Sequence, residues 1–246
     1  MKLNWKIALM CVLAIAMIAC KSKDEPESGS QGGGQSDYKS PISVRDQSVA
    51  DWDALDQSKV KKAVCPELPY FAGLKEAKVY ADAVCINFML TFDPEAMQSH
   101  TDVDGIHVYI NTDNSDATGG YWDLFAPING GNIDILLEGA LWDADGNELS
   151  YAPSVERWNG PLNGEGWYWE PIPASTGVTA SQLVGDNIVE CRILKELVPA
   201  KWDKDAFEIG FDIYQNFEPV GLLPQSNRPD GEHIGRALKM YVEFDK

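Results

Sequence analysis

The sequence predicts an all-β fold: a single antiparallel β-sandwich, of jelly-roll or immunoglobulin-like type, with short peripheral helices. Apolar and polar residues alternate with a period of two in several segments, whereas a helical stripe would repeat every three to four residues. Turns rich in Gly, Asn and Asp separate these segments. Several strands that each have one apolar face need a second sheet to cover them, and a sandwich provides it.

The alternation is clearest at 84–92, where Val84, Ile86, Phe88, Leu90 and Phe92 share one face. The same pattern predicts strands at 106–110, 133–137, 188–194, 207–213 and 238–244. Helical signals are short and predict brief helices within 49–64, 93–97 and 194–200. The chain has no internal repeat and no second linker after its N-terminal part, so we expect one β-sandwich domain over 44–246.

The N-terminal residues 1–19 have the pattern of a signal peptide. Lys2 and Lys6 precede an apolar run from Ile7 to Ala19. That run is shorter than the roughly 20 residues that a bilayer-spanning helix needs. It ends at Met-Ile-Ala-Cys20, which resembles a bacterial lipobox, where a cysteine receives lipid and becomes the new N-terminus. The alternative is an ordinary secretory signal, with Cys20 incidental.

Residues 20–43 are expected to form a flexible tether, because they are rich in Gly, Ser and acids and poor in large apolar side chains. Two or more acyl chains at Cys20, palmitate among them, would hold the protein stably on a membrane. Lys23-Asp24-Glu25 resembles the acidic export tag of some Gram-negative surface lipoproteins. We therefore expect an outer-membrane lipoprotein that faces the cell surface, although the sequence leaves the leaflet open.

Charge and cysteine content limit the partners and the covalent links. The chain has 20 Lys and Arg against 38 Asp and Glu, a formal net charge of −18, which repels phosphate backbones, so we expect no nucleic-acid partner. After Cys11 and Cys20, three cysteines remain: Cys65, Cys85 and Cys191. An odd number allows at most one disulfide, and the sequence leaves its pairing open.

An acidic loop, residues 111–120, follows the strand predicted at 106–110. Asn111, Asp113 and Asp116 lie within it, and Asp134 lies on the polar face of a later strand. Oxygen ligands at this spacing suit a hard cation, so we expect these four residues to hold structural calcium. The alternative is an ordinary hairpin loop, in which Asp and Asn side chains bond to their own backbone.

Exposed tryptophans are the candidate ligand-binding residues. Indoles stack on the apolar faces of sugars while neighbouring polar groups bind the hydroxyls. Trp167 and Trp169 are two positions apart, which predicts that both lie on one side of a strand. The candidate set is Trp122, Trp158, Trp167 and Trp169. Alternatively, these indoles fill the core. The sequence contains no hydrolase, zinc-protease or phosphate-loop motif, so no catalytic residue is assigned.

Three stretches resemble the domains similar to family nine carbohydrate-binding modules. They are Val49-Ala-Asp-Trp-Asp-Ala-Leu55, Lys78-Val-Tyr-Ala-Asp-Ala83, and Val108-Tyr-Ile-Asn-Thr-Asp-Asn114 with the strand that begins at Asp134. The resemblance extends to lipoproteins of Gram-negative glycan users. It implies a β-sandwich, calcium near the acidic loop, and glycan binding.

The expected function is therefore that of a membrane-anchored, non-catalytic lipoprotein that binds glycan through exposed tryptophans beside a calcium-ordered loop. The alternative is a structural or interaction lipoprotein that docks a partner surface protein and has no sugar ligand. A carbohydrate-active enzyme is the third hypothesis, and a catalytic carboxylate would distinguish it.

Overall fold

The computed structural model describes residues 39–44, 46–65, 73–93, 105–120, 131–140, 151, 153–164, 166–173, 178–179, 183–184, 187–215, 218–224 and 239–246. The chain divides into two units, Met1–Asp37 and Tyr38–Lys246. The predicted signal peptide 1–19, the lipidation site Cys20 and the tether as far as residue 38 lie outside the described residues.

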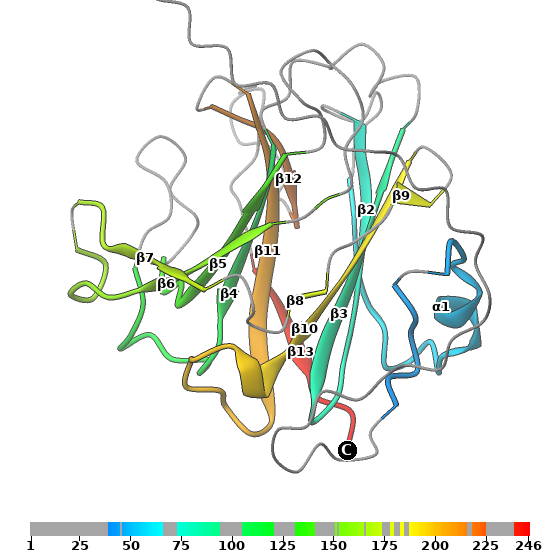
Figure 1. The fold of residues 1–246 in the computed structure, drawn as a ribbon, viewed down its shortest axis with the longest axis horizontal. Coiled ribbons are helices and arrows are strands. Elements are labelled where there is room, and N and C mark those ends of the chain that lie inside the picture. The colour runs from blue at the N-terminus through cyan, green and yellow to red at the C-terminus, as the bar shows by residue number, and fades with distance from the viewer. Residues whose placement is uncertain are drawn as a thin grey trace, which may run out of the picture. The chain divides into compact units, whose positions relative to one another are not determined.

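Two antiparallel β-sheets form the second unit, which confirms the predicted all-β sandwich (Figure 1). The first sheet has six strands, in the order β1-β2-β3-β10-β8, and β9 also pairs with β10. Their bounds are β1 Lys61–Val64, β2 Leu74–Ala81, β3 Cys85–Phe92, β8 Val178–Thr179, β9 Leu183–Val184 and β10 Ile188–Leu194.

The second sheet has seven strands, in the order β12-β11-β4-β5-β6-β7, and β13 also pairs with β11. The bounds are β4 Gly105–Asn111, β5 Ile135–Gly139, β6 Ser154–Trp158, β7 Trp169–Ile172, β11 Ala206–Gln215, β12 Glu218–Leu223 and β13 Met240–Glu243. The pairings between the described strands are antiparallel. Most join consecutive strands, whereas β3 with β10 and β4 with β11 join parts of the chain that are distant in sequence.

The core lies between the two sheets and is built by the alternating residues. Ile86, Phe88 and Leu90 of β3 and Phe211 of β11 belong to one buried cluster. The rings of Phe88 and Phe211 are 5.4 Å apart and join the sheets directly. Burying each such side chain contributes about 1.5–3 kcal/mol, so the apolar faces hold the two sheets together.

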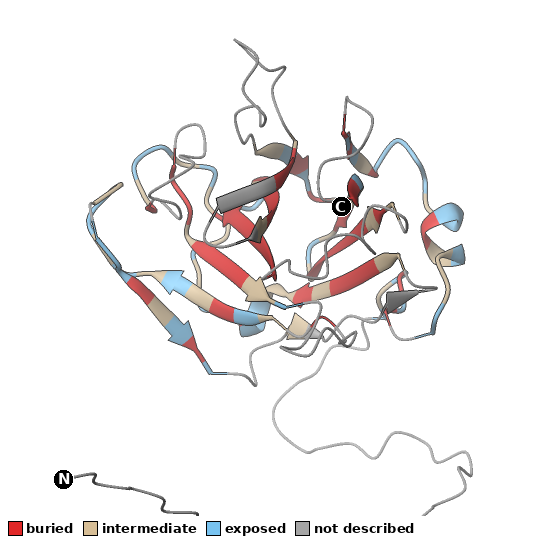
Figure 2. Cartoon of the chain, turned by 90° about the horizontal axis from the view of Figure 1, so that it is seen from above, coloured by how far each residue is buried: buried red, intermediate tan, exposed pale blue. Residues whose placement is uncertain are grey.

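The outer faces of the central strands are buried as well (Figure 2). Every residue of β4 is buried, and in β3 only Thr91 is partly exposed. On the outer face of the six-stranded sheet, Met89 and Tyr80 pack against Ile42, Val44 and Trp52. The packed part of the chain therefore includes Ile42, two residues before the predicted domain start at Val44.

Two short helices match the predicted peripheral ones. The α-helix α1 covers Ala50–Ala54, and the 3-10 helix η2 covers Lys195–Leu197. The helix predicted at 93–97 lies outside the described residues except for Asp93. No disulfide joins Cys65, Cys85 and Cys191, and Cys191 fills a fully buried position in the core.

Candidate functional site

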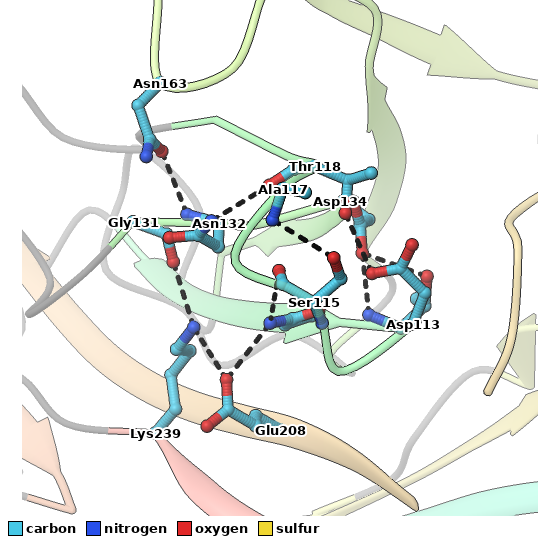
Figure 3. A network of polar contacts seen from close by, with 12 residues as sticks. Asp113, Ser115, Ala117, Thr118, Gly131, Asn132, Asp134, Asn163, Glu208 and Lys239 are labelled. Atoms are coloured by element: carbon cyan, nitrogen blue, oxygen red, sulfur yellow. Dashed lines mark hydrogen bonds and ion pairs between the residues drawn. The ribbon is translucent and has the colours of Figure 1, made fainter.

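The acidic loop follows β4 and is closed by hydrogen bonds among its own side chains (Figure 3). Asn111 Oδ1 accepts from the Ser115 backbone N–H at 3.3 Å. Thr118 Oγ1 donates to Asp113 Oδ1 at 2.8 Å. Asn114 and Gly119 have positive φ angles of 49° and 80°, which Asn and Gly adopt more readily than other residues. The loop is therefore held in a tight, locally determined conformation.

Asp134 ties this loop to the next strand of the sheet. Its Oδ2 accepts from the Thr112 backbone N–H at 2.8 Å and from Thr112 Oγ1 at 3.1 Å. Burial raises the pKa of Asp134 above its ordinary value, although the bonds from Thr112 oppose that rise. Thr112 Oγ1 also lies 2.9 Å from the Lys201 carbonyl oxygen, so its one proton serves either this acceptor or Asp134, and the loop also contacts the segment after η2.

Two lysines supply positive charge to the acidic loop and its neighbour Glu208. Lys239 Nζ lies 2.8 Å from Glu208 Oε2 and 3.0 Å from the Gly131 carbonyl oxygen, and its side chain is only 7% exposed. Glu208 Oε2 also accepts from Asn111 Nδ2 at 3.1 Å. Lys201 Nζ lies 3.2 Å from Asp113 Oδ2, but its side chain is 84% exposed. Lys239 is thus the buried counter-charge and Lys201 a solvated one.

The four predicted calcium ligands are only partly brought together. Asn111, Asp113 and Asp134 belong to the hydrogen-bonded network of the loop, whereas Asp116 is exposed. Within the part of the chain that the structure describes, no group of three or more His, Cys, Asp or Glu side chains is placed to hold a metal ion. Calcium binding stays a prediction, and the cation would have to compete with Lys201 for Asp113.

The tryptophan candidates differ in their surroundings. Trp169 begins β7 and is only 5% exposed, in a buried cluster with Tyr109 and Leu136. The expectation that Trp167 and Trp169 share an exposed strand face is therefore wrong, because Trp167 precedes the strand. Trp167 is 65% exposed and Tyr168 is 40% exposed. Trp158 is half-buried, and Trp122 lies outside the described residues.

We call the segment from Trp158 to Trp169, which links β6 to β7, the aromatic hairpin. The Trp158 ring packs edge-on against Tyr168 at 5.3 Å and against Trp169 at 5.2 Å. Its Nε1 donates to the Pro161 carbonyl at 3.1 Å. A Cβ at Gly160 would collide with the ring of Tyr168, so glycine is required for this packing. Trp158 is thus the internal support of a hairpin that exposes Trp167 and Tyr168.

The acidic loop and the aromatic hairpin are in direct contact. The Asn163 backbone N–H donates to the Gly119 carbonyl at 3.0 Å, and Asn163 Oδ1 accepts from the Asn132 backbone N–H at 3.0 Å. Asn132 Nδ2 then donates to the Thr118 carbonyl at 3.1 Å (Figure 3). The two sites predicted separately from the sequence form one unit, in which the loop supports the hairpin.

A buried polar cluster occupies the outer face of the seven-stranded sheet. His107 lies between Asp212 on β11 and Glu138 on β5, in register with both. His107 Nδ1 is 2.8 Å from Asp212 Oδ1, and Nε2 is 3.9 Å from Glu138 Oε1. Tyr109 donates to the other oxygen of Asp212. The Tyr214 ring stacks on the imidazole at 4.0 Å, and its hydroxyl donates to Glu138 at 2.9 Å.

The electrostatics of this cluster favour a charged imidazole. Burial acts to lower the pKa of His107, but Asp212 and Glu138 outweigh it and raise that pKa to about 9. His107 in turn lowers the pKa of Glu138. His107 and Asp212 are only 3% and 2% exposed, so this dyad is an internal ion pair of the sheet. Sequence alternation places His107 on the polar face of β4, but it cannot reveal that Asp212 and Glu138 flank it.

No protein-family model matches the chain, and a search of the curated proteins finds no match either. None of the helices among the described residues is long and apolar enough to cross a membrane.

Proposed function

We propose that this protein is a membrane-anchored, non-catalytic lipoprotein that binds glycan at the aromatic hairpin. The observation that carries the proposal is the exposure of Trp167 and Tyr168, at 65% and 40%, on a hairpin whose base is fixed. A group of exposed apolar side chains on one segment is a feature of interaction sites, and Leu162 of the same hairpin is also 50% exposed. The contact surface is thus Leu162, Trp167 and Tyr168.

The chemistry of this surface suits a sugar ring. An indole and a phenol ring offer flat apolar faces for the C–H side of a pyranose. Polar side chains stand at the base of the same hairpin. Glu170 pairs with Arg157 at 3.1 Å and accepts from Asn159 Nδ2, and Arg157 and Glu170 are half exposed. These groups have the donors and acceptors that sugar hydroxyls need, and rigid support lowers the ordering cost of binding.

The anchor is part of the same proposal and rests on the sequence. Lipid at Cys20 and an extended tether up to the packed residue Ile42 would place the domain at a membrane, and the proposed compartment is the outer membrane. The competing function is docking of a partner surface protein. The exposed aliphatic side chain of Leu162 favours that alternative more than a sugar does, so the test must distinguish the two.

The test is binding of the purified protein to a broad glycan panel, with calcium present. We expect a defined glycan to bind and Trp167→Ala to weaken that binding at least tenfold with an unchanged melting temperature. The matched control is Tyr241→Ala, because Tyr241 is a 49% exposed aromatic residue on β13, away from the hairpin. If the folded protein binds no glycan, or if Trp167→Ala and Tyr241→Ala lose glycan affinity equally, glycan binding at the aromatic hairpin is contradicted. Docking of a partner protein is then the better hypothesis.

A further inference from the structure

The outer face of the six-stranded sheet is covered by the segment 42–60, which we call the strap. Ile42, Val44 and Trp52 of the strap are 1–2% exposed, and Val60 is 7% exposed. They pack on Tyr80 and Met89 of the sheet. In Figure 1 the strap and its helix α1 lie beside β3 and β10, on the side away from β11. The strap is the first packed segment after the predicted tether.

One buried carboxyl group fastens the centre of the strap to the sheet. Trp52 Nε1 donates to Glu190 Oε1 at 2.6 Å, and Glu190 on β10 is completely buried. Glu190 Oε2 is also buried and has no hydrogen-bond partner among the described residues. A buried carboxylate with one donor is poorly compensated, so the neutral acid is the form that this site accommodates.

The charges around Glu190 favour the neutral acid overall. Burial, together with Asp46 and Asp51 on the strap, favours the neutral acid and outweighs the Trp52 N–H bond and Arg192 on β10, which favour the carboxylate. Arg192 is engaged elsewhere, because its guanidinium donates to the Ile42 carbonyl and, at 3.2 Å, to Asn87 Oδ1. The facing residue across the strand pair is the neutral Met89. The end of the strap at Ile42 is therefore held by Arg192, and its centre by Glu190.

We propose that Glu190 is a proton-controlled latch for the strap: the neutral acid is accommodated beneath the closed strap, whereas the ionised carboxylate favours opening of the Trp52 region to water, because its burial costs more than the stronger Trp52 N–H bond returns, while Arg192 keeps the Ile42 end attached. Release would expose the outer face of β3 and β10 at the point where the tether joins the domain. The latch would make the attachment of the domain to its anchor responsive to the acidity at the membrane surface.

The direction and size of the effect follow from linkage. Burial, the main cause, raises the pKa of Glu190 from 4.5 to about 7 when the strap is closed. The closed strap is thus fully favoured below pH 4.5 and loses that advantage as pH rises to about 7. The ratio of open to closed strap should increase roughly a hundredfold between pH 4.5 and 8 and level off above that.

The test follows the indole N–H of Trp52 by NMR in the full chain, labelled with ¹⁵N-tryptophan and ¹⁵N-phenylalanine and kept in detergent. Trp52→Phe assigns the signal. Hydrogen exchange of this N–H is measured from pH 4.5 to 8.5 in the native protein, in Glu190→Gln and in Glu196→Gln. Dividing by the rate in Glu190→Gln at each pH removes the intrinsic dependence of exchange on pH. Glu196 is an exposed acid in η2 and serves as the matched control.

We expect the normalised exchange rate to rise roughly a hundredfold between pH 4.5 and 8. The Trp52 signal should shift with a midpoint near 7 in the native protein and in Glu196→Gln, but not in Glu190→Gln. The amide of Phe88 in the core should keep its protection throughout. A Trp52 signal that does not change with pH, or the same normalised rate at every pH, would overturn the latch. If Glu190→Gln does not fold, the latch is tested by the native chain alone, from whether its Trp52 signal shifts with a midpoint near pH 7.

Discussion

Gly120, the last residue of the acidic loop, lies directly against the indole of Trp158, the first residue of the aromatic hairpin. A Cβ at position 120 would collide with three carbon atoms of that ring. The backbone of Gly120 also exchanges two hydrogen bonds with Ile133, at 2.9 and 3.0 Å, so the loop cannot easily retreat. This contact makes the geometry of the hairpin depend on the acidic loop.

Gly120→Ala should therefore displace Trp158 and destabilise the domain by about 1–3 kcal/mol, because an added methyl group overpacks a tight contact. Denaturant unfolding measures the loss. The control is Asp116→Ala in the same loop, where the side chain is exposed and a change within about 0.5 kcal/mol is expected. Equal stability of Gly120→Ala and the native chain would show that the hairpin is not seated on Gly120.

Trp169→Ala should destabilise the domain by about 3–5 kcal/mol, because this indole is buried and its removal leaves a cavity. Trp167→Ala should change the free energy of unfolding by less than about 0.5 kcal/mol. Thermal and denaturant unfolding of the two variants measure the difference. If both variants unfold equally easily, Trp167 is also part of the packed structure and cannot be a ligand platform.

Lys239→Met should cost about 3–5 kcal/mol, because it leaves Glu208 partly buried without its counter-charge. Lys201→Met is the matched control. Because the Lys201 side chain is exposed to solvent, removing its ion pair with Asp113 should lower the free energy of unfolding by less than about 1 kcal/mol. Denaturant unfolding at low and high salt compares them. A cost of Lys239→Met as small as that of Lys201→Met would contradict the role of Lys239 as the internal cation.

The free energy of unfolding should fall as pH rises from 6.5 to about 9, because His107 is held protonated in the folded state. A base whose pKa is raised on folding stabilises the protein fully below its unfolded value and loses this contribution as pH passes its folded value. The loss should be roughly 2–4 kcal/mol. Denaturant unfolding at intervals of half a pH unit measures it.

His107→Gln should flatten this pH dependence while lowering stability at pH 6.5, and Asp212→Asn should act in the same direction. A native chain whose stability is constant from pH 6.5 to 9 would mean that the imidazole is neutral in the folded protein. Glu190 titrates with a midpoint near pH 7 and overlaps the lower part of this range, so the pH dependence is also measured in Glu190→Gln, where only the loss from His107 remains.

Calcium binding by the acidic loop predicts heat in calorimetry on chelator-treated protein and a rise of the melting temperature that grows with calcium concentration. Asp113→Asn should remove both effects. Magnesium is the control ion, because its strict octahedral geometry suits this loop less well. If calcium produces no heat and no rise of the melting temperature, the calcium prediction is wrong, and Lys201 and Lys239 alone balance the negative charge of the loop.

The sequence predicted the strands with the strongest alternation and the two-sheet architecture, because one apolar face per strand is a local property. It could not predict what covers the other face. Trp52 and Glu190 are 138 positions apart in sequence, and no local sequence pattern predicts that they form a hydrogen bond. The same holds for His107 and Asp212, which are 105 positions apart.

The tryptophans show the limit of period-two reasoning. Spacing placed Trp167 and Trp169 on one face, but that rule applies only within a strand, and β7 begins at Trp169. The boundary depends on the pairing of Trp158 with Trp169, which joins distant parts of the hairpin. In the same way, the acidic loop was recognisable from its composition, whereas Lys239 and Asn163, which complete its network, lie far from it in sequence.

The most direct test of the proposed function is the affinity of the native protein and of Trp167→Ala for a glycan identified on the panel. The account predicts that the native protein binds, that Trp167→Ala loses at least tenfold in affinity while its melting temperature is unchanged, and that Tyr241→Ala binds normally. A native affinity retained by folded Trp167→Ala would contradict binding at the aromatic hairpin.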